Sequence, residues 1–405
     1  MKEKRLPLEG VRILDFTWAW AGPQATLLLA LMGAEVIKVE SKRRLDHSRL
    51  RSLVAGPSMI GPDASFIFNT LNLNKLSVTL NLSKPEAVEI AKSLAKISDV
   101  VAQNMRPGVL ERLGLGYEDL RQVKPDIIML SSSAVGGTGP ERLYTGYAPT
   151  FAAMGGMAYI TGRAGGRPAP LMGTIDLRVG STGTFAVLAA LYHRKMTGEG
   201  QHIDLSSAEA VSCLMGDAFM DFTMNGRVQE RAGNRNRAMA PHCVYRCRDD
   251  KWVSIAVCGE EEWRSLCGVI RDARLTSDDR FADAFSRWQN QEALDEIITE
   301  WTLERTPVEV MQSLQPAGVA AMPVYSGEEI VVDPHVLARG VIEEVEHPLM
   351  GKKKVLGPPW RLSKTPARVI RHGPLLGQHN DYVLGDLLGM SKEQIGRLTA
   401  DEVLY

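Results

Sequence analysis

The chain has 405 residues, of which 44% are hydrophobic and 23% are charged, values that are ordinary for a globular protein with two domains. The formal net charge of −1 argues against a nucleic-acid partner, which would require a basic surface. Five cysteines, with no signal-peptide pattern and no apolar run of about 18 residues, favour a cytoplasmic protein with no membrane partner.

The first 40 residues are patterned as a strand, a helix and a second strand, predicted at residues 11–16, 24–31 and 34–40. This length is typical of a parallel β-α-β unit. The loop after the first strand contains Trp18 and Trp20, and open α/β sheets bind ligands at that edge. Each tryptophan either packs in the interior or covers a flat ligand.

The alternation of strands and helices continues to about residue 205. Further strands are predicted at residues 77–82, 99–103, 126–131 and 202–207. Helices are predicted at residues 84–97, where Ser83 and Glu86 form a capping box, and at residues 109–115. This order predicts an α/β fold with a Rossmann-like, doubly wound parallel sheet.

Beyond residue 205 the pattern changes. A helix is predicted at residues 208–224, followed by a loop without periodicity at residues 230–241. A hairpin is predicted at residues 243–258, and helices are predicted at residues 260–269, 290–301 and 307–314. Together they predict a smaller α+β domain. A ribbon is predicted between residues 352–355 and 360–362, and a last helix at residues 381–388. His242, Cys243 and Cys247 lack a second ligand pair, so we expect no metal site.

A carboxylate precedes the apolar helix that contains residues 185–191. Basic residues at 193–195 and Gly198 mark the end of this helix, so Asp176 lies on or just before its first turn. Free backbone N–H groups and the helix dipole stabilise an ionised carboxylate there, and such a group can act as a nucleophile. The alternative is an ordinary N-cap with no chemical role.

Several motifs occur in the order and spacing of a known family. They are Asp15-Phe-Thr, Ala21-Gly-Pro, residues 33–40, Asn72-x-Asn-Lys75, Asn104-x-Arg-Pro-Gly, Thr197-Gly-Glu-Gly-Gln-His and Pro374-Leu-Leu-Gly-Gln-His. Over nearly its whole length the chain resembles the family III CoA-transferases, which include formyl-CoA transferase, carnitine CoA-transferase and α-methylacyl-CoA racemase. The resemblance implies a large domain from residues 1–205 and 335–405, a small domain from residues 225–325, linkers at 206–224 and 326–334, and an interlocked dimer.

The resemblance places the family's catalytic aspartate at Asp176. It implies coenzyme A contacts at Ala19, Trp20, Ala21, Ser41, Lys42, Leu80, Asn81, Asn104, Met105, Arg106, Arg112 and Tyr147. Trp20 is a departure, because the family often has a smaller polar residue there. CoA thioesters are then substrates, and no permanently bound cofactor is expected.

Attack by Asp176 on a thioester gives an aspartyl mixed anhydride and a CoA thiolate, which can return to the aspartyl carbonyl. Backbone N–H groups of the glycine pairs at residues 136–137 and 155–156 are candidate oxyanion donors. Two alternatives remain, a racemase and one subunit of a two-chain transferase. The family racemase uses a histidine where Tyr147 stands, and tyrosine, with a pKa of about 10, is a poor base at neutral pH.

Residues 17–23 and 43–51 look most like the succinyl-CoA:benzylsuccinate CoA-transferases of anaerobic toluene degradation. The two tryptophans of the first segment offer a wall for an aromatic acid. Arginines of the second segment can hold a second carboxylate, the candidates being Arg43, Arg44, Arg49 and Arg51. We therefore predict CoA transfer from succinyl-CoA to benzylsuccinate or a similar aromatic dicarboxylate, by a homodimer or a heteromer with a related subunit.

Overall fold

The computed structural model describes residues 5–50, 61–169, 171 and 173–405. The chain forms two compact units. The sheet unit consists of Met1–Ala158, Pro170–Val228 and Ala338–Tyr405, and the small unit of Tyr159–Ala169 and Gln229–Leu337. Within the described residues, no helix combines the length and the apolar character that a bilayer crossing requires.

A parallel sheet of six strands forms the centre of the sheet unit, in the order β3-β2-β1-β4-β5-β6. The strands are β1 (Arg12–Asp15), β2 (Glu35–Glu40), β3 (Leu76–Thr79), β4 (Val100–Gln103), β5 (Ile128–Ser133) and β6 (His202–Ser206). The order reverses between β1 and β4, which pair with each other through Leu14 and Val101. This reversal is the switch point at which doubly wound sheets bind ligands. The predicted α/β fold is confirmed.

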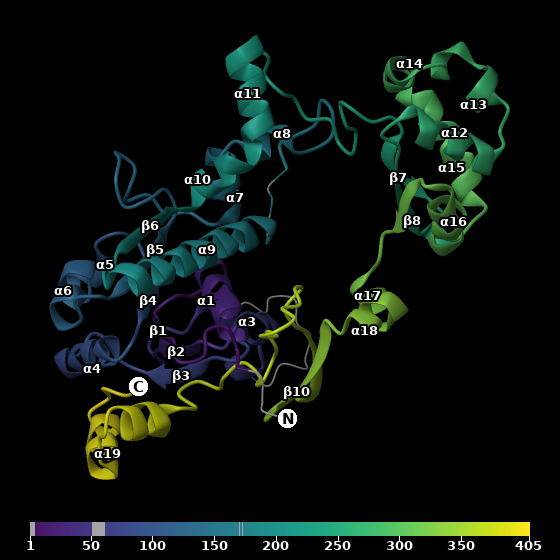
Figure 1. Cartoon of the computed structure of the whole chain (residues 1–405). Helices are drawn as coiled ribbons and strands as arrows, with labels where there is room; N and C mark the ends of the chain where they lie inside the picture. The colour runs from purple at the N-terminus through teal and green to yellow at the C-terminus, as the bar shows by residue number, and fades with distance from the viewer. Residues whose placement is uncertain (1–4, 51–60, 170, 172) are drawn as a thin grey trace. The chain divides into compact units, whose positions relative to one another are not determined.

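Successive residues of a strand point to opposite faces of the sheet. Apolar side chains lie on both faces here, so helices cover both faces. Ile13 packs with α1 (Ala21–Leu31) and α9 (Thr174–Thr197), whereas Leu14 packs with α4 (Pro85–Lys96) and α6 (Tyr117–Val123). Helices α1 and α9 lie directly against each other (Figure 1). Gly180 permits this contact, since a Cβ atom there would lie 2.6 Å from Gln24 Cγ.

The C-terminal part of the chain returns to the sheet beside β3. The His379 ring accepts a hydrogen bond from Ser77 N at 3.1 Å, and Asn380 accepts one from Thr79 N at 2.9 Å. The elements of this part are β10 (Ile342–His347), β11 (Gly351–Leu356), a π-helix (Asp381–Leu387) and α19 (Lys392–Ala400).

The remaining short helices are α2 (His47–Leu50), α3 (Phe66–Leu71), α5 (Val109–Arg112), α7 (Ala148–Met154), α8 (Met157–Ile160), α10 (Ser207–Ser212), α11 (Gly216–Asn225) and α18 (Pro334–Arg339).

The small unit has its own core, built on an antiparallel sheet in the order β7-β8-β9. Its strands are β7 (His242–Arg246), β8 (Trp252–Ala256) and β9 (Ala320–Pro323). The helices of the unit are α12 (Glu260–Ile270), α13 (Arg274–Ser277), α14 (Ala284–Gln289), α15 (Gln291–Leu303), α16 (Pro307–Leu314) and α17 (Gly327–Val332). Of these, α12, α13, α15 and α16 contribute residues to the core. The α+β character predicted for this region is therefore confirmed.

Local expectations failed where tertiary pairing decides the structure. Strand β11 pairs with β10, where Glu344 faces Lys354 and Glu346 faces Lys352, and not with residues 360–362. The predicted helix at residues 208–224 is interrupted by a 3₁₀ turn at Cys213–Met215. The predicted capping box is absent, because Lys84 and not Ser83 occupies the N-cap position of α4. The Ser83 hydroxyl donates to Asn81 Oδ1 at 2.6 Å.

Candidate active site

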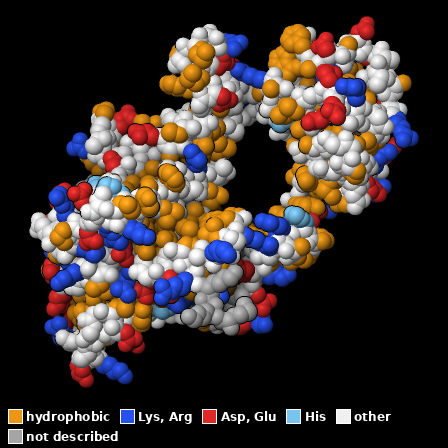
Figure 2. Space-filling view, in the orientation of Figure 1, with side chains coloured by type: hydrophobic (Ala, Val, Ile, Leu, Met, Phe, Trp, Pro, Cys, Tyr) orange, Lys and Arg blue, Asp and Glu red, His pale blue; other side chains and the backbone are white. Residues whose placement is uncertain are grey.

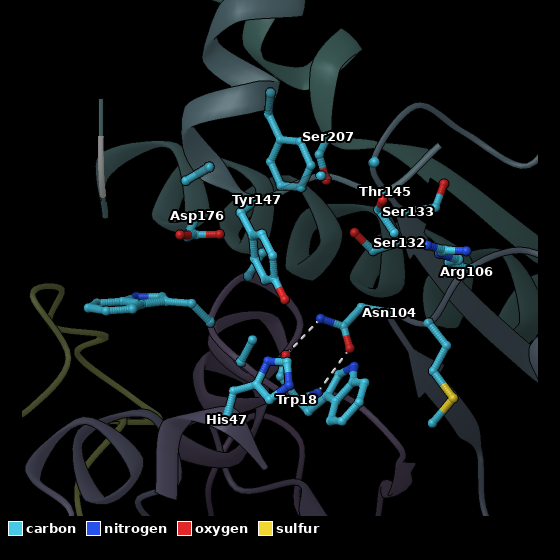
Figure 3. A pocket seen from close by; sticks show the side chains of 18 of the residues that line it. Trp18, His47, Asn104, Arg106, Ser132, Ser133, Thr145, Tyr147, Asp176 and Ser207 are labelled. Atoms are coloured by element: carbon cyan, nitrogen blue, oxygen red, sulfur yellow. Dashed lines mark hydrogen bonds between the residues drawn. The ribbon is translucent and has the colours of Figure 1, made fainter. Parts of the chain in front are cut away.

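A cavity of about 730 Å³ lies at the carboxyl edge of the sheet, beside the switch point between β1 and β4. Its walls come from the loops after β1, β4 and β5, from the turn before α2, and from the first turns of α7 and α9 (Figure 3). All of these segments belong to the sheet unit. The volume is in the range of small-molecule sites.

Asp176 is the third residue of α9 and lies on the cavity wall. Gly173 occupies the N-cap position with a φ of 71°, and its carbonyl accepts the hydrogen bond from Leu177 N. Asp176 is therefore in the first turn of α9 and not at its N-cap, so the predicted cap position is wrong. Helix α1 also starts at the cavity, where Ala21 forms part of the wall. The N-termini of two helices of 11 and 24 residues thus favour negative charge here.

The loop after β1 is tied to the loop after β4 by two hydrogen bonds. Trp18 N donates to Asn104 Oδ1 at 2.9 Å, and Asn104 Nδ2 donates to Trp18 O at 2.8 Å (Figure 3). Both backbone groups of Trp18 are thereby paired with one side chain. Since the two loops leave neighbouring strands of the switch point, this pair fixes the floor of the cavity.

Four buried charged side chains lie behind this loop, each at most 3% exposed. Lys75 pairs with Asp15 at 3.2 Å, and Lys38 pairs with Asp46 at 2.9 Å. Burial lowers the pKa of Lys75 to about 8, although Asp15 opposes that shift. Burial alone would raise the pKa of Asp46, but Lys38 and the N–H groups of its neighbours hold it below the ordinary value. The loop thus packs against two buried ion pairs, in which each cation is neutralised by a carboxylate.

An aromatic and cationic cluster forms one side of the cavity. The Trp18 and His47 rings stack with centroids 4.7 Å apart, and Tyr147 lies 6.4 Å from His47. The Arg44 guanidinium lies 4.1 Å from the Trp18 ring centroid. Sequence reasoning missed His47, because its position depends on the turn before α2 and no local pattern marks it.

The four arginines considered for a second carboxylate have different surroundings. Arg44 lies on the cavity wall. Arg49 is 1% exposed and paired with Glu40 at 2.8 Å and Asp63 at 2.6 Å, so its predicted substrate role is wrong. Arg43 is paired with Glu402 and is absent from the wall, and Arg51 lies outside the described residues.

The residues expected to contact coenzyme A fall into two groups. The cavity wall includes Ala19, Trp20, Ala21, Asn104, Met105, Arg106, Arg112 and Tyr147. The other four residues, Ser41, Lys42, Leu80 and Asn81, lie near the C-terminus of the chain and do not line the cavity. Ser41 Oγ donates to Tyr405 O at 2.9 Å, and Asn81 N donates to Val403 O at 2.8 Å.

The prediction that the backbone N–H groups of four glycines stabilise an oxyanion is wrong for three of them, because those three N–H groups are already paired. Gly137 N donates to the Asp204 carboxylate at 2.8 Å. The N–H groups of Gly155 and Gly156 donate to carbonyls of α7, so they too are already paired. The first turn of α9 is a better source, because its leading N–H groups have no acceptor within the helix.

Two buried polar atoms of wall residues have no hydrogen-bond partner among the described residues. They are the indole nitrogen of Trp20 and the hydroxyl oxygen of Ser133. A buried donor without a partner lowers stability, so proteins rarely retain one without a reason. Both atoms are therefore candidates for hydrogen bonds that form when substrate binds and the wall adjusts.

The chain was compared with known families and proteins. The sequence model of CoA-transferase family III matches residues 8–380. Succinyl-CoA–D-citramalate CoA-transferase of Chloroflexus aurantiacus is 36% identical over 403 residues, which cover 98% of each chain. The beta subunit of succinyl-CoA–L-malate CoA-transferase from the same organism is 33% identical, again over 98% of both chains. A crystal structure of a CAIB/BAIF family protein from Brucella suis superimposes with a TM-score of 0.85 at 27% identity, covering 95% of this chain and all of that one.

Proposed function

The chain belongs to CoA-transferase family III, and we propose that Asp176 is the nucleophile that transfers CoA in the cavity at the switch point. The position of this carboxylate carries the proposal. It lies on the wall of a cavity where two helix N-termini meet, so both the carboxylate and the oxyanions formed from it are stabilised.

The reaction proceeds through four exchanges at acyl carbons. Asp176 attacks the donor thioester, the C–S bond breaks, and an aspartyl mixed anhydride and a CoA thiolate form. The thiolate attacks the aspartyl carbonyl, which releases the donor acid and leaves CoA on Asp176. The acceptor carboxylate then attacks this thioester, the C–S bond breaks, and a second anhydride and the CoA thiolate form. Finally the thiolate attacks the acceptor's acyl carbon, which yields the new acyl-CoA and restores Asp176.

Trapping the covalent intermediate tests this role. The enzyme is incubated with succinyl-CoA, quenched with hydroxylamine and digested, and mass spectrometry locates the modified peptide. We expect a hydroxamate at Asp176 in the wild type and in the control Asp217→Asn, because Asp217 lies in the first turn of α11 but not on the cavity. Turnover without any modification of Asp176 would refute the proposal.

We propose succinyl-CoA as the donor and benzylsuccinate, or a similar aromatic dicarboxylate, as the acceptor. Two observations support this choice. The named relatives are succinyl-CoA transferases that act on dicarboxylic acids, citramalate and malate. In this chain Trp18 offers an aromatic surface, and Arg44 beside it offers a cation for a carboxylate.

A panel of acceptor acids with succinyl-CoA tests the substrate. Benzylsuccinate, phenylacetate, citramalate, malate and glutarate separate the aromatic requirement from the requirement for two carboxylates. We expect the highest kcat/KM for benzylsuccinate and the lowest for the aromatic monocarboxylate. Good turnover of an aliphatic acid beside no turnover of benzylsuccinate would refute the aromatic specificity and leave the role of Asp176 intact.

His47 keeps the racemase alternative testable, because it places an imidazole on the same cavity wall as Asp176. A racemase would exchange the α-proton of a 2-methylacyl-CoA with solvent. We expect no deuterium incorporation in D₂O while CoA transfer proceeds. Exchange without transfer would favour the racemase.

We propose that the chain works as a dimer or with a related subunit. The side chains of Phe185, Tyr192 and Met196 are 73%, 68% and 67% exposed along one face of α9. Figure 2 shows hydrophobic side chains gathered over α9 and α11, and a surface of this kind marks a protein interface. One relative is named as the beta subunit of a transferase.

Light scattering of the purified chain, with and without the change Phe185→Asp, tests this assembly. We expect a dimer for the wild type and a shift towards monomer for the variant. A monomer that is fully active by itself would contradict the proposal. A monomer that gains activity only with a related subunit would support the heteromer.

A further inference from the structure

Asp46 lies between Arg44, in the turn before α2, and His47, the first residue of α2, yet it is not itself on the cavity wall. Its side chain is almost wholly buried, at 2% exposure. Its Oδ1 atom accepts hydrogen bonds from the Ser48 backbone N–H at 2.8 Å and from the Ser48 hydroxyl at 2.7 Å. The carboxylate thus fixes the start of α2, from which His47 projects.

The same oxygen atom also holds the loop after β1. Ala19 N donates to Asp46 Oδ1 at 2.9 Å. Ala19 has a φ of 67°, in the left-handed region that residues other than glycine rarely adopt. A single carboxylate oxygen therefore joins the turn before α2 to a strained point of the Trp18 loop.

Lys38 completes this arrangement on the other side of Trp18. Its Nζ atom lies 2.9 Å from Asp46 Oδ2 and donates to Thr17 O at 2.6 Å. The residues before and after Trp18 are consequently both bound to one buried ion pair. The indole in turn contacts Arg44 and His47, which come from the turn that Asp46 stabilises.

We propose that Asp46 is a positioning residue, which with Lys38 sets the Trp18 ring against Arg44 and His47 before the acid substrate binds. It acts through these three side chains and touches no substrate. The inference rests on the proposed function in taking this cavity as the place of CoA transfer and Trp18 with Arg44 as the surface that binds the acid. It predicts that the loop geometry, and with it acid recognition, depends on the Asp46 carboxylate.

Steady-state kinetics of Asp46→Asn tests the proposal, because asparagine keeps the shape of the side chain but removes the charge that faces Lys38. We expect the KM for the acceptor acid to rise about tenfold or more, with a smaller change in kcat. Asp99→Asn is a matched control. Asp99 also accepts a backbone N–H bond, from Arg12, and pairs with Arg194, but it precedes β4 at the opposite edge of the sheet.

A variant with both changes, Lys38→Met and Asp46→Asn, guards against misfolding caused by an unpaired buried lysine. Its thermal melt shows whether the fold is kept, and its acceptor KM is expected to rise as in the single variant. Unchanged acceptor KM in a folded double variant would overturn the proposal.

A double-mutant cycle with Trp18→Ala separates positioning from general destabilisation. If Asp46 acts through the Trp18 ring, Asp46→Asn raises the acceptor KM much less in the Trp18→Ala background than in the wild type. Equal fold-changes in both backgrounds would overturn the positioning role. If Trp18→Ala leaves both kcat and the acceptor KM unchanged, the acid does not bind at the Trp18 ring, and the proposed acid site fails while the role of Asp176, which hydroxylamine trapping tests, is unaffected. A loss in Trp18→Ala without a loss in Asp46→Asn overturns the positioning role alone.

Discussion

The loop after β1 and the loops after β2 and β3 leave the same edge of one sheet, yet their surroundings differ. The first loop faces an open cavity and is bound from behind by buried charges. Ser41, which starts the loop after β2, and Asn81, which follows β3, are instead covered by the chain's own C-terminal residues, which accept hydrogen bonds from both side chains. A position at the carboxyl end of a strand is therefore not sufficient for a site. What packs against that position decides whether a substrate can reach it.

The largest difference in kcat/KM between the cavity and the region covered by the C-terminus is expected from a change of Asp176, the proposed nucleophile. Asp176→Ala is expected to lower kcat/KM by about 10³-fold or more, because the described wall residues include no second carboxylate that could form the proposed anhydride. Asn81→Ala, in the covered region, is expected to lower stability by about 1 kcal/mol and to leave kcat nearly unchanged. Succinyl-CoA consumption and urea unfolding of both variants measure these effects. Equal kinetic losses would remove the distinction between the regions.

A smaller effect is expected from the cation on the cavity wall. Arg44→Ala is expected to raise the KM of a dicarboxylate acceptor about 10- to 100-fold, because a charge-assisted hydrogen bond is lost. The KM of a monocarboxylate acceptor serves as an internal control and should change little. Lys42→Ala provides the matched change in the covered region, where the ammonium lies 5.4 Å from the Tyr405 ring centroid. A comparable rise in the KM for Lys42→Ala would place the acid elsewhere.

The two regions also differ in how far the sequence could predict them. Apolar patterns predicted the strands, and an apolar run that ends in basic residues and Gly198 predicted that Asp176 lies at a helix start, because such signals are local. The cover over Asn81 is formed by Glu402, which lies 321 residues away in the chain. Likewise His47 reaches the cavity only through the turn that Asp46 fixes. Contacts between distant segments leave no periodic trace, so neither feature could be derived from spacing.

The covered region is expected to respond to acid. Burial lowers the pKa of His379 from 6.5 to about 4, and Arg371 adds to the shift. Between these two pH values the unfolded chain binds more protons than the folded one, so stability falls as the pH drops through this window. Partial exposure of the ring limits the loss to about 1–2 kcal/mol.

The change His379→Gln tests this dependence, because glutamine can still accept the hydrogen bond from Ser77 N but does not titrate. Urea unfolding at pH 4.5 and pH 7 should show a smaller difference in stability for the variant than for the wild type. The same difference in both proteins would show that other groups cause the acid sensitivity.

The smallest effect is expected from the ion pair at the margin of the covered region. Arg43 pairs with Glu402 at 3.1 Å, but about half of each side chain is exposed to solvent, which weakens the attraction. Arg43→Ala is therefore expected to change the free energy of unfolding by no more than about 0.5 kcal/mol and to leave the acceptor KM within about twofold of the wild type. Arg44→Ala, one residue further along, is the matched comparison, because that guanidinium lies against Trp18 in the cavity. If Arg43→Ala raised the acceptor KM as much as Arg44→Ala, the acid would bind across both side chains and the boundary between the two regions would have to move.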